Sequence, residues 1–154
     1  MPKKRTLERA REDAREGKSP STQAGEFVRE EMHHIREGKH GAASPKQAIA
    51  IGLSKARRAG VKLKPPRRGN TSASTRQKAA RAYEKGQTHS GRKTSARRSR
   101  ARKQALKKEG REAASHQALS RQARSAARKC GSTSRHNAAV KASRTRKSHR
   151  RAKS

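Results

Sequence analysis

The strongest constraint on this sequence is the uneven distribution of its charge. Residues 65–154 contain 28 lysines and arginines and three acidic residues, whereas residues 1–64 contain 16 and eight. Because the whole chain is 27% hydrophobic and 1% aromatic, its C-terminal part has too little apolar surface to offset the entropy lost on folding. The sequence therefore predicts a packed core in the N-terminal part and a long basic tail that is largely disordered or conditionally helical.

A short amphipathic helix is predicted over residues 45–59, where the sequence is most apolar. Ser44 can cap this helix, Pro45 suits its first position, and Gln47 completes a capping box. Gly60 follows the last apolar residues and is expected to end the helix. The local sequence therefore predicts both ends of this helix.

A second amphipathic helix is predicted over residues 20–37, and a short connection makes the two helices a helical hairpin. The hairpin buries few large side chains, so we expect it to be barely stable alone and able to form a homodimer through its apolar face. The predicted hairpin core consists of Phe27, Val28, Met32, Ile35, Ile49, Ile51 and Leu53.

The predicted fold is mainly α, and composition divides it into four segments. Residues 1–18 form a charged N-terminal helix that Thr6 can cap and that faces solvent, and residues 19–64 form the hairpin domain. Residues 65–74 form a linker with proline, glycine and serine, and residues 75–154 form a tail of arginine, lysine, alanine and serine.

The tail nevertheless contains helix signals. A serine opens each of two windows, from Ser74 to Gly86 and from Ser95 to Gly110, and a third window runs over residues 111–131. Each window has about one large hydrophobic residue, and repulsion between its cations opposes helix formation. We therefore expect these helices to form when phosphates screen the charge.

Nucleic acid is the predicted partner of the tail, because each phosphate that a cation neutralises releases bound counterions. Phe27 and Tyr83 are the only aromatic residues, so platforms for stacking bases are absent, which favours duplex DNA. The predicted nucleic-acid-binding residues are Arg57, Arg58, Arg67, Arg68, Arg97, Arg98, Arg100, Arg102, Lys103, Lys107, Lys108, Arg121, Arg124, Arg128, Lys129, Arg144, Arg146, Lys147, Arg150 and Arg151.

The predicted function is non-specific binding of double-stranded DNA, which would compact or protect DNA in the nucleoid of the cytoplasm. Two alternatives stay open at this point. The chain could be an RNA-binding or ribosome-associated basic protein, or a stress-related adaptor whose hairpin binds a protein while the tail only localises it. Competition between duplex DNA and structured RNA distinguishes the DNA-binding interpretation from the RNA-binding one.

No catalytic residue, cofactor or metal site is predicted. The sequence lacks the GxSxG, Walker and GxGxxG motifs that nucleophilic catalysis and phosphate binding require. Glu30, His33, His34 and Glu37 lie at helical spacings with His40 just beyond, but they do not form an HExxH motif. The sequence therefore predicts that the protein is not an enzyme.

The sequence also predicts a reducing compartment and no membrane segment. Cys130 is the single cysteine and excludes an intramolecular disulfide. The longest apolar run, residues 48–53, is far shorter than the roughly 20 residues that span a bilayer. Residues 1–18 are basic but lack the apolar region of a signal peptide.

Residues 25–66, GEFVREEMHHIREGKHGAASPKQAIAIGLSKARRAGVKLKPP, resemble a bacterial domain of unknown function found in small, very basic proteins. The stretch QAIAIGLSKARRAG is the most distinctive part. The resemblance implies a bacterial cytoplasmic protein of a kind often labelled uncharacterised or DNA-binding, and it implies no catalytic residues. The tail is loosely similar to linker-histone-like bacterial proteins, although it favours arginine and lacks a regular repeat.

Overall fold

The computed structural model shows a mainly α-helical protein and describes residues 2–88 and 95–151, with side chains as far as residue 148. No β-strand occurs in these residues. The chain divides into two compact units, Met1–Ser115 and His116–Ser154. The predicted helical fold class is therefore confirmed.

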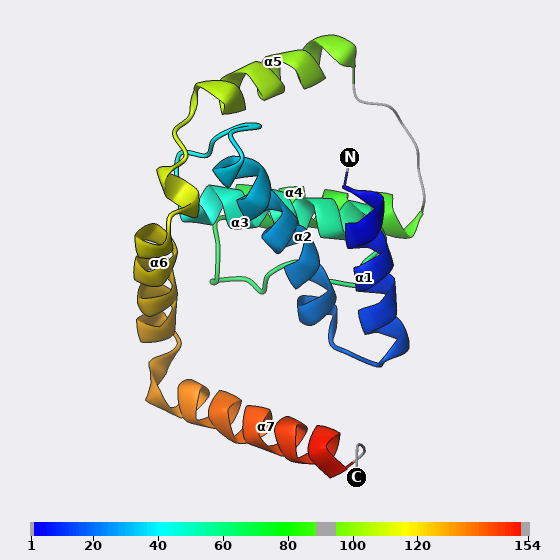
Figure 1. Ribbon diagram of the computed structural model, residues 1–154, viewed down its shortest axis with the longest axis vertical. Helices are drawn as coiled ribbons and strands as arrows, with labels where there is room; N and C mark the ends of the chain where they lie inside the picture. Colours follow the sequence, from blue (N-terminus) through cyan, green and yellow to red (C-terminus); the bar gives the residue numbers. More distant parts are fainter. Residues whose placement is uncertain (1, 89–94, 152–154) are drawn as a thin grey trace. The chain divides into compact units, whose positions relative to one another are not determined.

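Seven α-helices and one 3-10 turn make up the described regular structure, and Figure 1 labels the α-helices along the chain. The first unit contains five of these helices and the turn, and the second unit contains two helices. Their bounds are α1 (Lys4–Arg15), α2 (Pro20–Arg36), α3 (Pro45–Arg58), α4 (Ala73–Gln87), α5 (Ala96–Lys108), η1 (Glu112–Ala114), α6 (His116–Lys129) and α7 (Gly131–Arg151).

The predicted ends of α3 are confirmed. The Ser44 hydroxyl accepts a hydrogen bond of 3.2 Å from the Gln47 backbone N–H, as an N-cap does. Gln47 Oε1 accepts from the backbone N–H of Ala43 at 2.8 Å, so the capping box closes one residue before the cap. Gly60 follows the helix with a φ of +94°, which favours glycine.

Helices α2 and α3 pack closely because a glycine lies where they meet. A Cβ atom at Gly52 would lie 2.7 Å from the Cα of Val28, so no larger residue fits between the two backbones. Figure 1 shows α2 lying across α3. One cluster of buried apolar residues, the apolar cluster, consists of Ala10, Ala24, Phe27, Ala56 and Val61, with Leu7, Leu53 and Leu63 partly buried against them.

The residues of the predicted hairpin core differ in burial. Phe27, Met32 and Ile35 of α2 are buried. The α3 residues Ile49, Ile51 and Leu53 are only partly buried, as is Val28. The fully buried face of α3 instead consists of Ala48, Gly52 and Ala56, at a spacing of four residues.

Helix α1 differs from the predicted solvent-facing helix capped by Thr6. It begins at Lys4, and Thr6 and Ala10 are buried against the rest of the unit. The backbone N–H of Lys3 donates a 2.8 Å hydrogen bond to Glu30 Oε1 of α2. This contact between distant residues starts the helix earlier than the local capping signal predicts.

Helix α4 and turn η1 correct the prediction that the tail lacks a core. Ala79 and Ala82 of α4 are buried, and a Cβ atom at Gly86 would lie 1.8 Å from the Arg57 carbonyl oxygen of α3. Ala114 of η1 is also buried, and its carbonyl oxygen accepts from Arg36 Nε at 2.9 Å. Small side chains let these backbones approach one another, so burial occurs without large hydrophobic residues.

Helices α5, α6 and α7 also contradict the predicted disorder, but they do so without burying side chains. They are helical, although α5 and α6 contain no buried residue and residues 131–148 of α7 are all exposed. Alanine, arginine and lysine are strong helix formers, and here their propensity outweighs charge repulsion. The helical windows that begin at Ser95 and residue 111 are confirmed, whereas α7 extends beyond every predicted window.

Candidate functional site

Exposed cations gather on α5, which contains no acidic residue. Ser95 caps this helix by accepting a 3.3 Å hydrogen bond from the Arg98 backbone N–H. Because no face of α5 is buried, its basic side chains extend into solvent on all sides. These exposed residues are Arg97, Arg98, Arg100, Arg102, Lys103, Lys107 and Lys108, all of which the sequence predicts to contact nucleic acid.

Helices α6 and α7 carry further exposed cations. Arg121, Arg124 and Arg128 lie at i, i+3 and i+7, which places them along one side of α6. A row of arginines on one side of a helix can contact successive phosphates. The other predicted residues of these helices, Lys129, Arg144, Arg146 and Lys147, are exposed, and the side chains of Arg150 and Arg151 lie outside the described set.

Ion pairs separate the basic residues into two groups. Within residues 2–88 and 95–148, every ion pair joins residues that lie between Arg9 and Lys55. The arginines and lysines of α5, α6 and the described part of α7 have no acidic partner in this set. Their positive charge is therefore not neutralised within the protein.

Arg57 is not placed as a nucleic-acid contact. It is 6% exposed, and its Nε donates a 3.1 Å hydrogen bond to the Leu63 carbonyl oxygen. Burial lowers the pKa of its guanidinium. The chain folds back after α3 and covers this side chain, whereas the predicted contacts Arg58, Arg67 and Arg68 are exposed.

The two aromatic residues are not available as a stacking platform. Phe27 is 1% exposed and belongs to the apolar cluster, and Tyr83 of α4 is partly buried. Proteins that bind single strands stack successive bases on exposed aromatic rings. The described surface therefore offers many charges but neither of the two large aromatic rings.

Two neighbouring glutamates of α2 are buried and face different helices. Glu30 accepts the hydrogen bond from Lys3 beside α1, while Glu31 Oε2 pairs with the Lys55 ammonium of α3. Glu30 Oε2 and Glu31 Oε1 are buried without a hydrogen bond. A buried polar atom without a partner costs about 1–3 kcal/mol, so these carboxylates have unused capacity to bind a donor or a cation.

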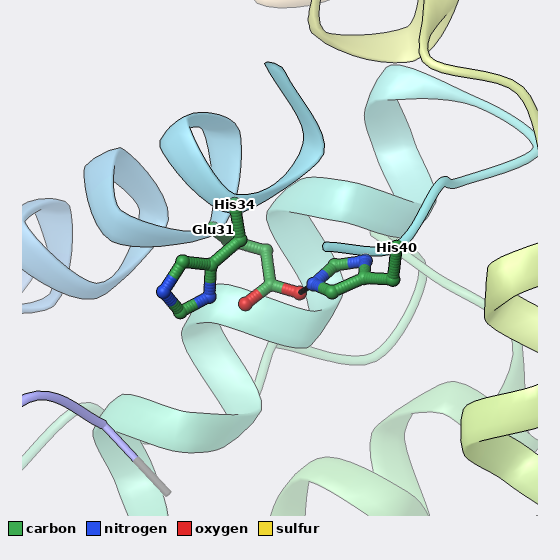
Figure 2. Close-up of side chains that lie close together, drawn as sticks. All are labelled: Glu31, His34 and His40. Atoms are coloured by element: carbon green, nitrogen blue, oxygen red, sulfur yellow. Dashed lines mark ion pairs between the residues drawn. The ribbon is translucent and has the colours of Figure 1, made fainter. Parts of the chain in front are cut away.

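Two histidines flank the Glu31 carboxylate. Figure 2 shows this carboxylate between the rings of His34, which follows on α2, and His40, which lies in the loop before α3. His40 Nε2 lies 3.1 Å from Glu31 Oε1, but the pair does not have hydrogen-bond geometry. The side chains of Glu31, His34 and His40 each provide one ligand atom, and these atoms lie within 4.8 Å of one another.

The surroundings of His34 influence its protonation, and those of His40 include a backbone hydrogen-bond acceptor. Burial lowers the pKa of His34, and the opposing effect of Glu30, whose Oε1 lies 3.6 Å from His34 Nε2, is smaller. His34 is therefore neutral at pH 7. His40 Nδ1 lies 3.0 Å from the Gly41 carbonyl oxygen, which accepts a hydrogen bond when this nitrogen carries the proton.

Sequence reasoning missed the role of Glu31. Of the residues weighed as metal ligands, His33 and Glu37 are exposed, and Glu31 was not among them. A local signal did exist, because Glu31 lies four residues after Phe27 and four before Ile35, in the middle of the buried stripe of α2. A carboxylate in that position must find a partner, and here the partners come from α3 and the loop before it.

Comparison with known proteins gives one coarse result. Residues 19–68 match a family described as Family of unknown function (DUF6496). This match confirms that the segment is a domain of unknown function, while the bacterial origin and the DNA-binding label implied by the resemblance stay predictions. No curated protein and no solved structure matches the chain. Among the described helices, none combines the length and apolarity needed to cross a bilayer.

Proposed function

We propose that this protein binds duplex DNA non-specifically, through phosphate contacts from α5, α6 and α7. The observation that carries the proposal is the separation of paired from unpaired charge. All ion pairs among the described residues join side chains within residues 9–55. In contrast, α5 alone exposes seven cations that have no acidic partner among the described residues. Cations that the fold does not use are free to neutralise phosphates and release counterions.

Duplex DNA is favoured over single strands and RNA for two reasons. Among the described residues neither Phe27 nor Tyr83 is exposed, and the chain has no tryptophan, so the large rings that stack unpaired bases are not presented at the surface. The major groove of B-DNA also admits an α-helix, whereas that of an RNA duplex is deep and narrow. Alanine and serine between the cations of α5 keep the helix slender enough to approach the phosphate backbone.

The test is fluorescence anisotropy with the full chain and two unrelated duplexes over a salt series. If roughly ten cations contact phosphate together, log affinity falls with log salt at a slope near −9, which weakens binding by about five powers of ten between about 50 and 200 mM salt. Both duplexes should bind alike, because phosphate contacts carry no sequence information. Structured RNA at equal phosphate should compete less well.

A matched pair of variants separates a defined interface from bulk charge. Replacing Arg97, Arg100, Lys103 and Lys107 of α5 by glutamine should reduce the slope by about three to four. The control replaces Arg5, Arg11, Arg15 and Lys46, which are also exposed, and leaves the same net charge. Equal losses in both variants would show that only total charge matters. Strong discrimination between the duplexes would indicate base readout, and stronger competition by RNA would favour an RNA-binding protein.

A further inference from the structure

We propose that Glu31, His34 and His40 bind one divalent transition-metal ion of the zinc class. One carboxylate oxygen and two imidazole nitrogens form a donor set that suits Zn²⁺ and similar ions. These donors come from α2 and from the loop before α3 (Figure 2). The site is separate from the proposed DNA contacts, since it contains none of their cations.

The separations between the donor atoms fit a shared ion. Metal bonds of about 2.0–2.2 Å in a tetrahedral site place ligand atoms roughly 3.3–3.6 Å apart. His40 Nε2 and Glu31 Oε1 are 3.1 Å apart and thus close to this separation. All three ligand atoms lie within 4.8 Å of one another, so a small rotation of a side chain completes the triangle.

The buried oxygen of Glu31 supplies a second, independent observation. Lys55 occupies Oε2, whereas Oε1 is buried without a hydrogen bond. If His40 merely formed a charged pair with Glu31, its N–H would point at this oxygen with hydrogen-bond geometry. The contact lacks that geometry, so His40 leaves the buried Oε1 without a hydrogen bond and available to an ion.

His40 also has an acceptor for its other ring nitrogen, and the other ring nitrogen of His34 lies on the side of a carboxylate. Histidines that bind metals usually donate this second N–H to a carboxylate or a backbone carbonyl. His40 Nδ1 lies 3.0 Å from the Gly41 carbonyl oxygen, and His34 Nε2 lies 3.6 Å from Glu30 Oε1. The Gly41 carbonyl therefore leaves His40 Nε2 available to the ion, while His34 Nε2 is turned towards Glu30 and leaves His34 Nδ1 for the ion.

The local charge decides which ions can bind. Lys55 contacts Glu31, and both Lys55 and Lys39 act electrostatically on His34, so they offset the negative charge of Glu30 and Glu31. Binding must therefore depend on coordination by imidazole nitrogen and less on general attraction of cations. Mg²⁺, which prefers oxygen ligands, should not replace Zn²⁺. The bound ion would tie the loop before α3 to α2.

The experiment titrates the EDTA-treated full chain with Zn²⁺ by calorimetry and with Co²⁺ by visible absorption. We expect one ion per chain, a Co²⁺ spectrum typical of tetrahedral coordination by the three side chains and one water, and no binding of Mg²⁺. His34→Gln and His40→Gln should each weaken binding by more than the roughly 10–100-fold that loss of an outer partner causes, and Glu30→Gln should fall within that range. His33→Gln is the matched control, because His33 is exposed on the same helix.

Two further measurements keep the outcome decisive. Circular dichroism checks that each variant folds, and Lys55→Met removes the cation that competes for Glu31 while keeping a long apolar stem, so it should tighten Zn²⁺ binding. A wild-type protein that binds no stoichiometric Zn²⁺ overturns the proposal. Equal weakening by His33→Gln and His40→Gln also overturns it, because binding would then be a general property of surface histidines.

Discussion

Helices α3 and α6 are equally long and both end in two basic residues, yet they differ in what they contact. Helix α3 buries Ala48, Gly52 and Ala56, whereas α6 has no buried residue and carries a row of exposed arginines. The basic end of α3 is also partly used by the fold, because Arg57 is buried there. The difference shows that helices of similar composition can have different roles. A helix whose small residues lie on one face packs against its neighbours, whereas a helix whose arginines lie on one face keeps their charge exposed to solvent.

The largest expected effect tests whether the charge of α6 is used for binding alone. Replacing Arg121, Arg124, Arg128 and Lys129 by glutamine should lower duplex affinity by roughly three powers of ten at about 0.1 M salt, if all four contact phosphate. The free energy of unfolding should change by less than about 0.5 kcal/mol, because these side chains are exposed. Anisotropy and urea denaturation measure the two quantities. A large loss of stability would show that α6 contributes to packing after all.

The next prediction compares a buried and an exposed hydrophobic residue. Phe27→Ala should cost about 3–5 kcal/mol of unfolding free energy, because it leaves a cavity in a small cluster of apolar residues. Val140→Ala in α7 should cost less than about 0.5 kcal/mol, since Val140 is exposed. Urea denaturation followed by circular dichroism gives both values. Similar costs would mean that α7 packs against another surface in solution.

A pair of glycine substitutions tests the close approach of α2 and α3. Gly52→Ala should destabilise the protein by about 1–3 kcal/mol, because its Cβ would lie 2.7 Å from Val28 Cα and force the helices apart. Gly25→Ala is the control, since a Cβ there meets nothing within 4 Å. It should stabilise α2 by up to about 1 kcal/mol through helix propensity. Thermal unfolding of the two variants should therefore shift in opposite directions.

The smallest expected effect separates folding from binding at one position of α5. Arg98→Glu places a carboxylate three residues after the Ser95 cap and four before Arg102, which completes a capping box and adds an attractive pair. The helical signal should rise slightly, by an amount equivalent to a few tenths of a kcal/mol. Duplex affinity should fall at the same time. If duplex affinity and helicity rise together, Arg98 does not contact phosphate. Arg98→Gln is the neutral reference, because it removes the positive charge without adding a negative one.

Local signals in the sequence predicted most of the helices correctly. Ser44 and Ser95 were recognised as caps because an N-cap bonds to a backbone N–H only three residues away. Thr6 was assigned wrongly as a cap, since the start of α1 depends on a bond from Lys3 to Glu30, 27 residues away. In the tail, pattern reasoning counts only large hydrophobic residues, so it misses the burial of Ala82 and Ala114.

The residues of the candidate sites also differ in whether local sequence predicts their positions. Exposed cations such as Arg121 follow from composition, because a helix with a single large apolar residue, Leu119, offers no broad apolar face for packing. Burial of Arg57 did not follow, since it requires the chain to return as far as Leu63. The cluster around Glu31 needs Lys55 from α3 and His40 from the preceding loop. Only the packing of α2 on α3 brings these three residues together.

The small buried face of α3 has a consequence for the freedom that side chains lose on folding. An alanine has no rotamers to give up, whereas burying a leucine or isoleucine costs about 0.5–1 kcal/mol of side-chain entropy. Contacts made by Ala48 and Ala56 therefore cost no side-chain entropy, and helix formation has already ordered their backbone. Such a face has no alternative side-chain arrangement, so α3 can meet its neighbours in very few registers.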